Sequence, residues 1–77
     1  MQAYIQVLEV LRKLDGKALL QNLYDEYRRH DPKITMSQLL QILMKLEIHG
    51  KVRVSSLDEE RKVVELLEQA SLGTRPG

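Results

Sequence analysis

The stretch Ile34–Val54, ITMSQLLQILMKLEIHGKVRV, places a helix and a strand in close succession and decides the fold. Thr35 and Gln38 match a capping box, in which each side chain binds the backbone N–H of the other residue at the start of a helix. The helix is expected to end at Gly50, because glycine lets the chain turn sharply at little steric cost. Beyond it, apolar and polar residues alternate in KVRVSS, which predicts a strand over 51–56.

Two further amphipathic helices are predicted upstream of this stretch. Over 3–14, apolar residues cover more than half of the helix circumference and leave a narrow polar strip. A second helical pattern runs over 17–30, and Asp15 is placed to cap its start, while Gly16 is placed to end the first helix. Pro32 ends the second helix, because the residue before a proline is pushed toward extended geometry.

The segment after the strand has two interpretations. DEERKVVEL can form a charged turn and a returning strand, which would supply the neighbour that an isolated strand lacks. The run Ser56–Glu59 also matches a capping box, so that 57–70 can instead form a fourth helix. The strand is favoured, because sequence neighbours usually pair. Residues 1–70 are expected to form a single domain, and 71–77 a flexible C-terminal tail.

Composition narrows the classes of function. The chain has 77 residues, 43% of them hydrophobic and 30% charged, as in one ordinary soluble domain. It has no cysteine, which excludes disulfides and thiolate metal sites. No apolar run is long enough to cross a membrane and no secretory signal is visible, so a cytoplasmic protein is expected. The many Lys, Arg and Glu residues beside a single Asn are typical of a thermophile-like composition.

Enzyme chemistry has little support in the sequence. His30 and His49 lack further ligands at metal-binding spacing, and the isolated glycines form no phosphate-binding loop. No serine lies in a nucleophile-elbow context, and the acidic run Asp58–Glu60 is typical of a solvated turn. We therefore expect no catalytic residue, cofactor, metal or small-molecule substrate.

Three helices followed by a β-hairpin is the element order of a winged helix-turn-helix domain, and the chain resembles that family over about residues 4–67. The resemblance rests on ITMSQLLQILMKLEIHGKVRV followed by DEERKVVEL, where Leu46 precedes the helix-ending Gly50 and a charged turn separates two strands. The likeness is to archaeal and bacterial regulators, including the D-x-x-R turn of multiple-antibiotic-resistance-type regulators. It implies a mostly α fold with a small β-hairpin, that is, a three-helix winged helix-turn-helix domain.

The resemblance also implies double-stranded DNA as a partner and a role in transcription regulation. In such domains the third helix lies in the major groove and its early residues face base edges. Glutamine can pair with adenine, lysine can reach guanine or a phosphate, and cations around the preceding turn and on the hairpin would contact phosphates. The base-facing candidates are Ser37, Gln38, Gln41 and Lys45, and the phosphate-contacting candidates are Arg28, Arg29, Lys33, Lys51, Arg53, Arg61 and Lys62.

Other features favour a protein-interaction subunit, such as an accessory factor of a replication, transcription or chromosome-organising complex. The third helix has one cation and a second apolar row, which can equally belong to the core, and the acidic hairpin tip would repel phosphates. The first helix has more apolar residues than one small core is expected to hold, which predicts a homodimer or a protein partner there. The interface candidates are Tyr4, Val7, Leu8, Leu11, Leu40, Met44 and Ile48.

Overall fold

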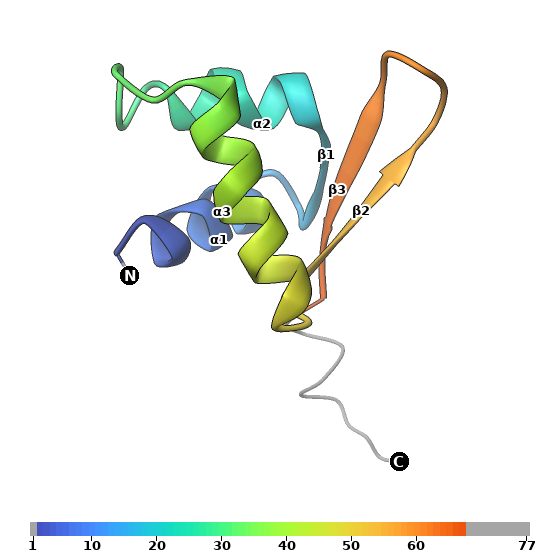
Figure 1. Ribbon diagram of the computed structural model, residues 1–77. Helices are drawn as coiled ribbons and strands as arrows, with labels where there is room; N and C mark the ends of the chain where they lie inside the picture. Colours follow the sequence, from blue (N-terminus) through green and yellow to red (C-terminus); the bar gives the residue numbers. More distant parts are fainter. Residues whose placement is uncertain (1, 68–77) are drawn as a thin grey trace.

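Three helices and one small sheet make up the part of the chain that the computed structural model describes, residues 2–67 (Figure 1). The elements follow one another as α1 (Gln2–Lys13), β1 (Lys17–Leu19), α2 (Leu20–Tyr27), α3 (Met36–Ile48), β2 (Val52–Ser56) and β3 (Lys62–Leu66). The strands form one antiparallel sheet in the order β1-β3-β2. The architecture is mixed α/β and is compatible with a winged-helix layout.

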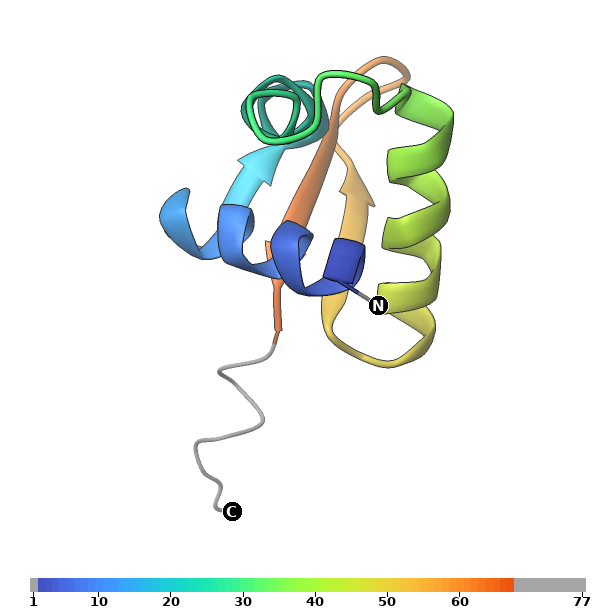
Figure 2. The ribbon, with the colours of Figure 1, turned by 90° about the vertical axis from the view of Figure 1, so that its left-hand side faces the viewer.

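The helices pack against one face of this sheet. Val52 on β2 and Val64 on β3 are buried on that face, and α1 lies in front of the strands in Figure 2. On the opposite face, Lys17, Glu65 and Arg53 lie next to one another in register across the three strands. The outer face of the sheet is therefore charged, whereas the inner face forms part of the core.

The core absorbs most of the apolar arc of α1. Val7 and Leu11 are fully buried and Val10 nearly so, because α1 contacts β1 and β3 of the sheet as well as α2 and α3. The core therefore holds more of these residues than the sequence suggested, although it does not hold all of them. Ile5, with 57% of its surface exposed, is the large apolar residue of α1 that the core leaves out. The buried core consists of Val7, Val10, Leu11, Leu23, Tyr27, Ile34, Leu39, Leu43, Leu46, Val52 and Val64.

Both ends of α3 have the geometry that the sequence predicts. At the start, the N–H of Gln38 donates to Thr35 Oγ1 and the N–H of Thr35 donates to Gln38 Oε1, each at 3.1 Å. At the end, Gly50 adopts a φ of +75°, which a residue without a side chain reaches most easily. The N–H of Lys51 then donates to the carbonyl of Leu46 at 2.8 Å, so the chain turns directly from α3 into β2.

The helix predicted over 17–30 is wrong at its beginning. Residues 17–19 form β1, which pairs with β3 so that Ala18 lies opposite Val64, and α2 starts only at Leu20. A three-residue strand has almost no local signature, and pairing with a distant strand overrides the helical pattern that continues through it.

Asp15 does not cap α2 as predicted. It adopts a φ of +68°, Gly16 follows with a φ of +80°, and the residue at the N-cap of α2 is Leu19, without a side-chain hydrogen bond. The carbonyl of Gly16 accepts the N–H of Leu66 at 2.7 Å. These two left-handed residues therefore turn the chain from α1 onto the edge of β3.

The returning strand, rather than a fourth helix, follows β2. β2 and β3 pair along their whole length, from Val52 opposite Leu66 to Ser56 opposite Lys62, with a turn between them. The remainder of the alternative helix, 68–70, and the predicted tail lie outside the described residues. None of the helices in residues 2–67 is long and apolar enough to cross a membrane.

Candidate functional site

Two rows of side chains run along the uncovered side of α3. Residues four apart lie on the same side of a helix, so each set of three forms a line. The polar row consists of Ser37, Gln41 and Lys45, all exposed. The apolar row consists of Leu40, Met44 and Ile48, whose surfaces are 38%, 60% and 76% exposed. These residues are not part of the core, so the apolar row is free to contact something outside the domain.

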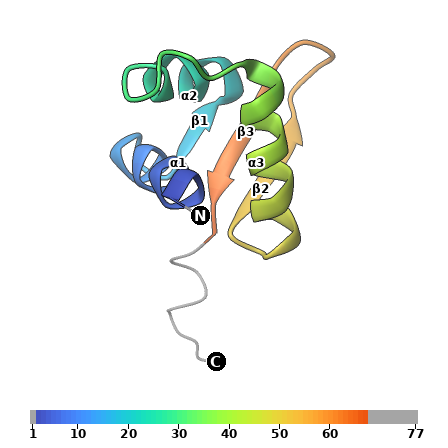
Figure 3. The ribbon, with the colours of Figure 1, turned by 60° about the vertical axis from the view of Figure 1, so that its left-hand side comes forward.

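A groove of about 310 Å³ lies between α3 and the β2–β3 hairpin. The two elements diverge from the turn that joins them toward the hairpin tip in Figure 1, and α3 lies in front of β2 in Figure 3. Lys62 on the hairpin side donates a hydrogen bond to Ser56 Oγ at 3.4 Å. Two residues of the apolar row, Leu40 and Met44, border this groove, which is lined by Leu40, Leu43, Met44, Glu47, Val54, Ser56 and Lys62.

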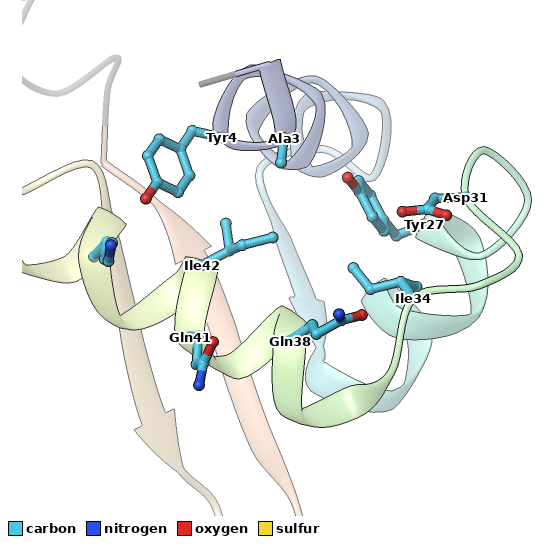
Figure 4. Close-up of a pocket in the computed structure, with 9 residues that line it drawn as sticks. Ala3, Tyr4, Tyr27, Asp31, Ile34, Gln38, Gln41 and Ile42 are labelled. Atoms are coloured by element: carbon cyan, nitrogen blue, oxygen red, sulfur yellow. The ribbon is translucent and has the colours of Figure 1, made fainter.

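A second cavity, of about 300 Å³, lies on the other flank of α3, between α3, α1 and the end of α2 (Figure 4). Ile42 points into it, whereas the amide of Gln41 points away from it. The phenol of Tyr27 donates to Gln6 Oε1 at 3.4 Å, and its burial, together with the negative charge of Asp31, raises the pKa of Tyr27. The lining residues are Ala3, Tyr4, Tyr27, Asp31, Ile34, Gln38, Gln41, Ile42 and Lys45.

Besides Lys62, three of the predicted phosphate-contacting cations have partners inside the chain. Arg28 lies over a tyrosine ring of α2 at 5.4 Å, Arg29 pairs with a glutamate of α2 at 3.6 Å, and Arg61 pairs with Asp58 at 2.8 Å. Exposed ion pairs contribute at most about 1 kcal/mol, so these cations can still exchange their partner for a phosphate. Lys33, in the turn before α3, donates its backbone N–H to Asp31 Oδ1 at 3.3 Å, and its ammonium group has no partner within residues 2–67.

Asp58 organises the hairpin tip. Its Oδ1 accepts the backbone N–H groups of Glu60 and Arg61 at 2.9 and 2.8 Å, and its Oδ2 accepts Arg61 Nε at 2.9 Å. The Arg61 side chain, followed by the two backbone N–H groups, holds the pKa of Asp58 below its ordinary value. The charge of Asp58 is thus balanced within the turn, which weakens the repulsion of phosphates expected from the acidic tip.

The predicted hairpin cations lie on two different faces. Val52 faces the core, so its neighbours Lys51 and Arg53 point to the opposite, outer face of the sheet. Lys62 lines the groove beside α3, and Lys45 lies on α3 itself. The structure therefore places Lys45 and Lys62 on either side of the apolar row, and separates them from Lys51 and Arg53 by the sheet.

The predicted interface on α1 is largely inaccessible. Val7 and Leu11 are fully buried within the chain, which removes them from any interface, and Tyr4 and Leu8 are half-buried against the core. The exposed apolar residue of α1 is Ile5, which the sequence analysis did not select. Its exposure could not be found from the helical pattern, because the pattern does not show which neighbours cover each side of α1.

Among residues 2–67, no group of three His, Cys, Asp or Glu side chains is placed to hold a metal ion. No protein family model matches the chain, and comparisons with curated proteins and with solved structures find no match. The function is therefore inferred from the chemistry of the surfaces of the chain itself.

Proposed function

We propose that the protein is a small winged-helix DNA-binding protein of the transcriptional-regulator type, with α3 in the major groove of double-stranded DNA. The observation that carries this proposal is the exposed polar row of α3, which combines hydroxyl, amide and ammonium groups and contains no acidic residue. A major groove about 12 Å wide admits an α-helix. In helix-turn-helix domains the second helix of the motif lies there, with its early residues on the bases.

Each residue of the polar row has a role that its chemistry supports. The amide of Gln41 can donate and accept two hydrogen bonds at once with adenine, and Lys45 can reach guanine or a phosphate. Lys33 before α3 and Lys62 across the groove would contact the phosphates on either side. Gln38 has a smaller role, because its amide oxygen already accepts the N–H of Thr35.

Fluorescence anisotropy with a random-sequence duplex, repeated over a salt series, tests this proposal. The logarithm of the affinity should fall linearly with the logarithm of the salt concentration, by about 0.9 for each phosphate neutralised. Lys45→Ala should lower that slope by about one such unit. Lys17→Ala is the matched control, because Lys17 is an exposed lysine on the outer face of the sheet. The absence of binding at low salt, or equal effects of the two substitutions, would contradict the proposal.

A second candidate function is a protein-interaction subunit, and the exposure of the apolar row favours it. Met44 and Ile48 present most of their surface to solvent, and Met44 lines an open groove, as the anchor residues of a partner-binding helix do. Under this function, Ile48→Glu should abolish assembly with the partner, whereas the double substitution Lys45→Glu and Arg53→Glu should leave assembly unchanged. This function would be contradicted if the Lys45→Glu and Arg53→Glu double variant lost assembly while Ile48→Glu kept it.

We also propose that the chain forms a homodimer, as the sequence suggests. A dimer would place two copies of α3 about one DNA turn apart, which suits a target with two half-sites. Ile5 is the accessible apolar residue of α1 through which such a contact would form. Sedimentation equilibrium over a concentration series should show a dimer for the natural chain and a monomer for Ile5→Glu; a monomer in both cases would refute this.

A further inference from the structure

We infer that α3 selects A·T base pairs, with Gln41 recognising adenine and the apolar row contacting the C5-methyl group of thymine. The inference rests on the proposed function, and it names the class of DNA sequence that the same surface would bind. Both rows of α3 would then contact the same DNA, the polar row through base edges and the apolar row through thymine methyl groups.

The chemistry of the two rows matches an A·T base pair better than a G·C base pair. In the major groove, adenine presents an acceptor at N7 and a donor at N6, which are the complements of a glutamine amide. Thymine is the standard base that presents a methyl group there, and apolar side chains contact it. Guanine is most often recognised by arginine or lysine, and α3 contains no arginine and a single lysine, Lys45.

The positions of the residues on the helix allow these contacts to be made together. Met44 lies four residues after Leu40 and three after Gln41, so its side chain neighbours both of theirs on the exposed side of α3. Gln41 points away from the cavity on the α1 flank, as Figure 4 shows. The rise from 37 to 44 is about 10 Å, at 1.5 Å per residue. This length matches about three base pairs at 3.4 Å each.

The burial and charge of the apolar row also suit DNA. Met44 is 60% exposed and Leu40 is 38% exposed, so both have apolar surface that a methyl group could cover. Methionine is flexible and adapts to the shape of its partner. The acidic residue of α3, Glu47, lines the groove on the hairpin side, where Lys62 also lies. The part of the row that would enter the DNA groove first, Leu40 and Met44, is therefore flanked by the uncharged Ser37 and Gln41.

Replacing thymine by deoxyuridine tests the inference directly, because the exchange removes the methyl group and leaves the base pairing unchanged. Anisotropy is measured with two duplexes of the same A·T-rich sequence, one containing thymine and the other deoxyuridine. The thymine duplex should bind about fourfold more tightly for each methyl group contacted, because burying a group of this size contributes about 0.8 kcal/mol. A third duplex, rich in G·C pairs, should bind more weakly than the thymine duplex.

Two variants assign the effect to residues. Met44→Ala should reduce the preference for thymine over deoxyuridine, and Gln41→Ala should reduce the preference for A·T over G·C. Leu57→Ala is the matched control, because Leu57 is 58% exposed but lies outside α3, in the turn between β2 and β3. It should leave both preferences unchanged.

The outcomes separate this inference from the proposed function. Salt-dependent binding with equal affinity for thymine and deoxyuridine would overturn the inference and leave DNA binding intact. Unchanged preferences in Met44→Ala and Gln41→Ala would overturn the assignment to α3. No binding to any duplex at low salt would overturn both, and the apolar row would then be assigned to a protein partner.

Discussion

Thr35 and Gln38 hold each other's backbone N–H groups at the start of α3, with two hydrogen bonds of 3.1 Å each. The pair closes the first turn of the helix, where backbone donors otherwise have no partner. It also fixes the direction in which α3 leaves the turn after α2, and hence the orientation of both rows on its exposed side. The capping box thus connects the stability of α3 to the surface proposed to bind DNA.

Thr35→Ala should lower the free energy of unfolding by about 1 kcal/mol, because it removes the oxygen that accepts the Gln38 N–H. Urea denaturation measures the loss. Ser37→Ala is the control within the same turn: Ser37 is exposed and its hydroxyl makes no hydrogen bond to another residue of the described chain, so its substitution should change stability by less than about 0.5 kcal/mol. Equal losses in the two variants would show that the cap contributes nothing specific.

Two apolar residues of α3 should respond very differently to truncation. Leu39 is fully buried, and Leu39→Ala should cost about 2–5 kcal/mol through lost burial and the cavity left behind. Met44 is mostly exposed, and Met44→Ala should change stability by less than about 0.5 kcal/mol. Thermal or urea unfolding checks both. A loss of several kcal/mol in Met44→Ala would place the apolar row in the core instead of at a binding surface.

Gly50→Ala should destabilise the chain by about 1–2 kcal/mol through backbone conformation alone. Gly50 has a φ of +75°, and a Cβ added there would meet no atom within 4 Å, so the cost is not a clash. Gly50→Asn should cost less, because asparagine tolerates the left-handed region better than alanine does. The ranking is measured by urea denaturation, and an asparagine variant less stable than the alanine variant would contradict this explanation.

The hairpin tip should change with acid. The folded pKa of Asp58 lies below its ordinary value of 3.8, so Asp58 contributes stability that is present above the unfolded pKa. That contribution is lost as the pH falls through the folded pKa. NMR titration of the side-chain carboxyl should show this low pKa, and Arg61→Ala should raise it toward the ordinary value. Titration of Asp58 at its ordinary pKa in the natural chain would show that the Arg61 contact is not maintained in solution.

The sequence was most informative where structure is determined locally. The start of α3 depends on two residues three positions apart, and its end on Gly50, so both could be predicted. β2 and β3 were also predictable, because alternation and a short turn define a hairpin. Of the two interpretations of 57–70, the strand was favoured because it gives β2 a neighbouring strand to pair with, which a fourth helix would not.

The remaining features depend on contacts between distant residues. β1 could not be predicted because residues 17–19 continue a helical pattern and become a strand only through β3. The core position of Val7 and Leu11 depends on contacts of α1 with the sheet and with two other helices, which no local pattern reveals. For the same reason, the sequence could list the cations of the hairpin but could not place Arg53 and Lys62 on opposite faces.

The central strand of the sheet is also its last strand along the chain. During synthesis, β1 and β2 leave the ribosome before β3. In the folded sheet each of them pairs with β3 and not with the other. The nascent chain therefore contains three helices and two strands, β1 and β2, that have no pairing partner until residues 62–66 emerge. A premature stop just before residue 62 would not merely shorten the sheet. It would remove the partner of both edge strands and leave their backbone groups open to other chains.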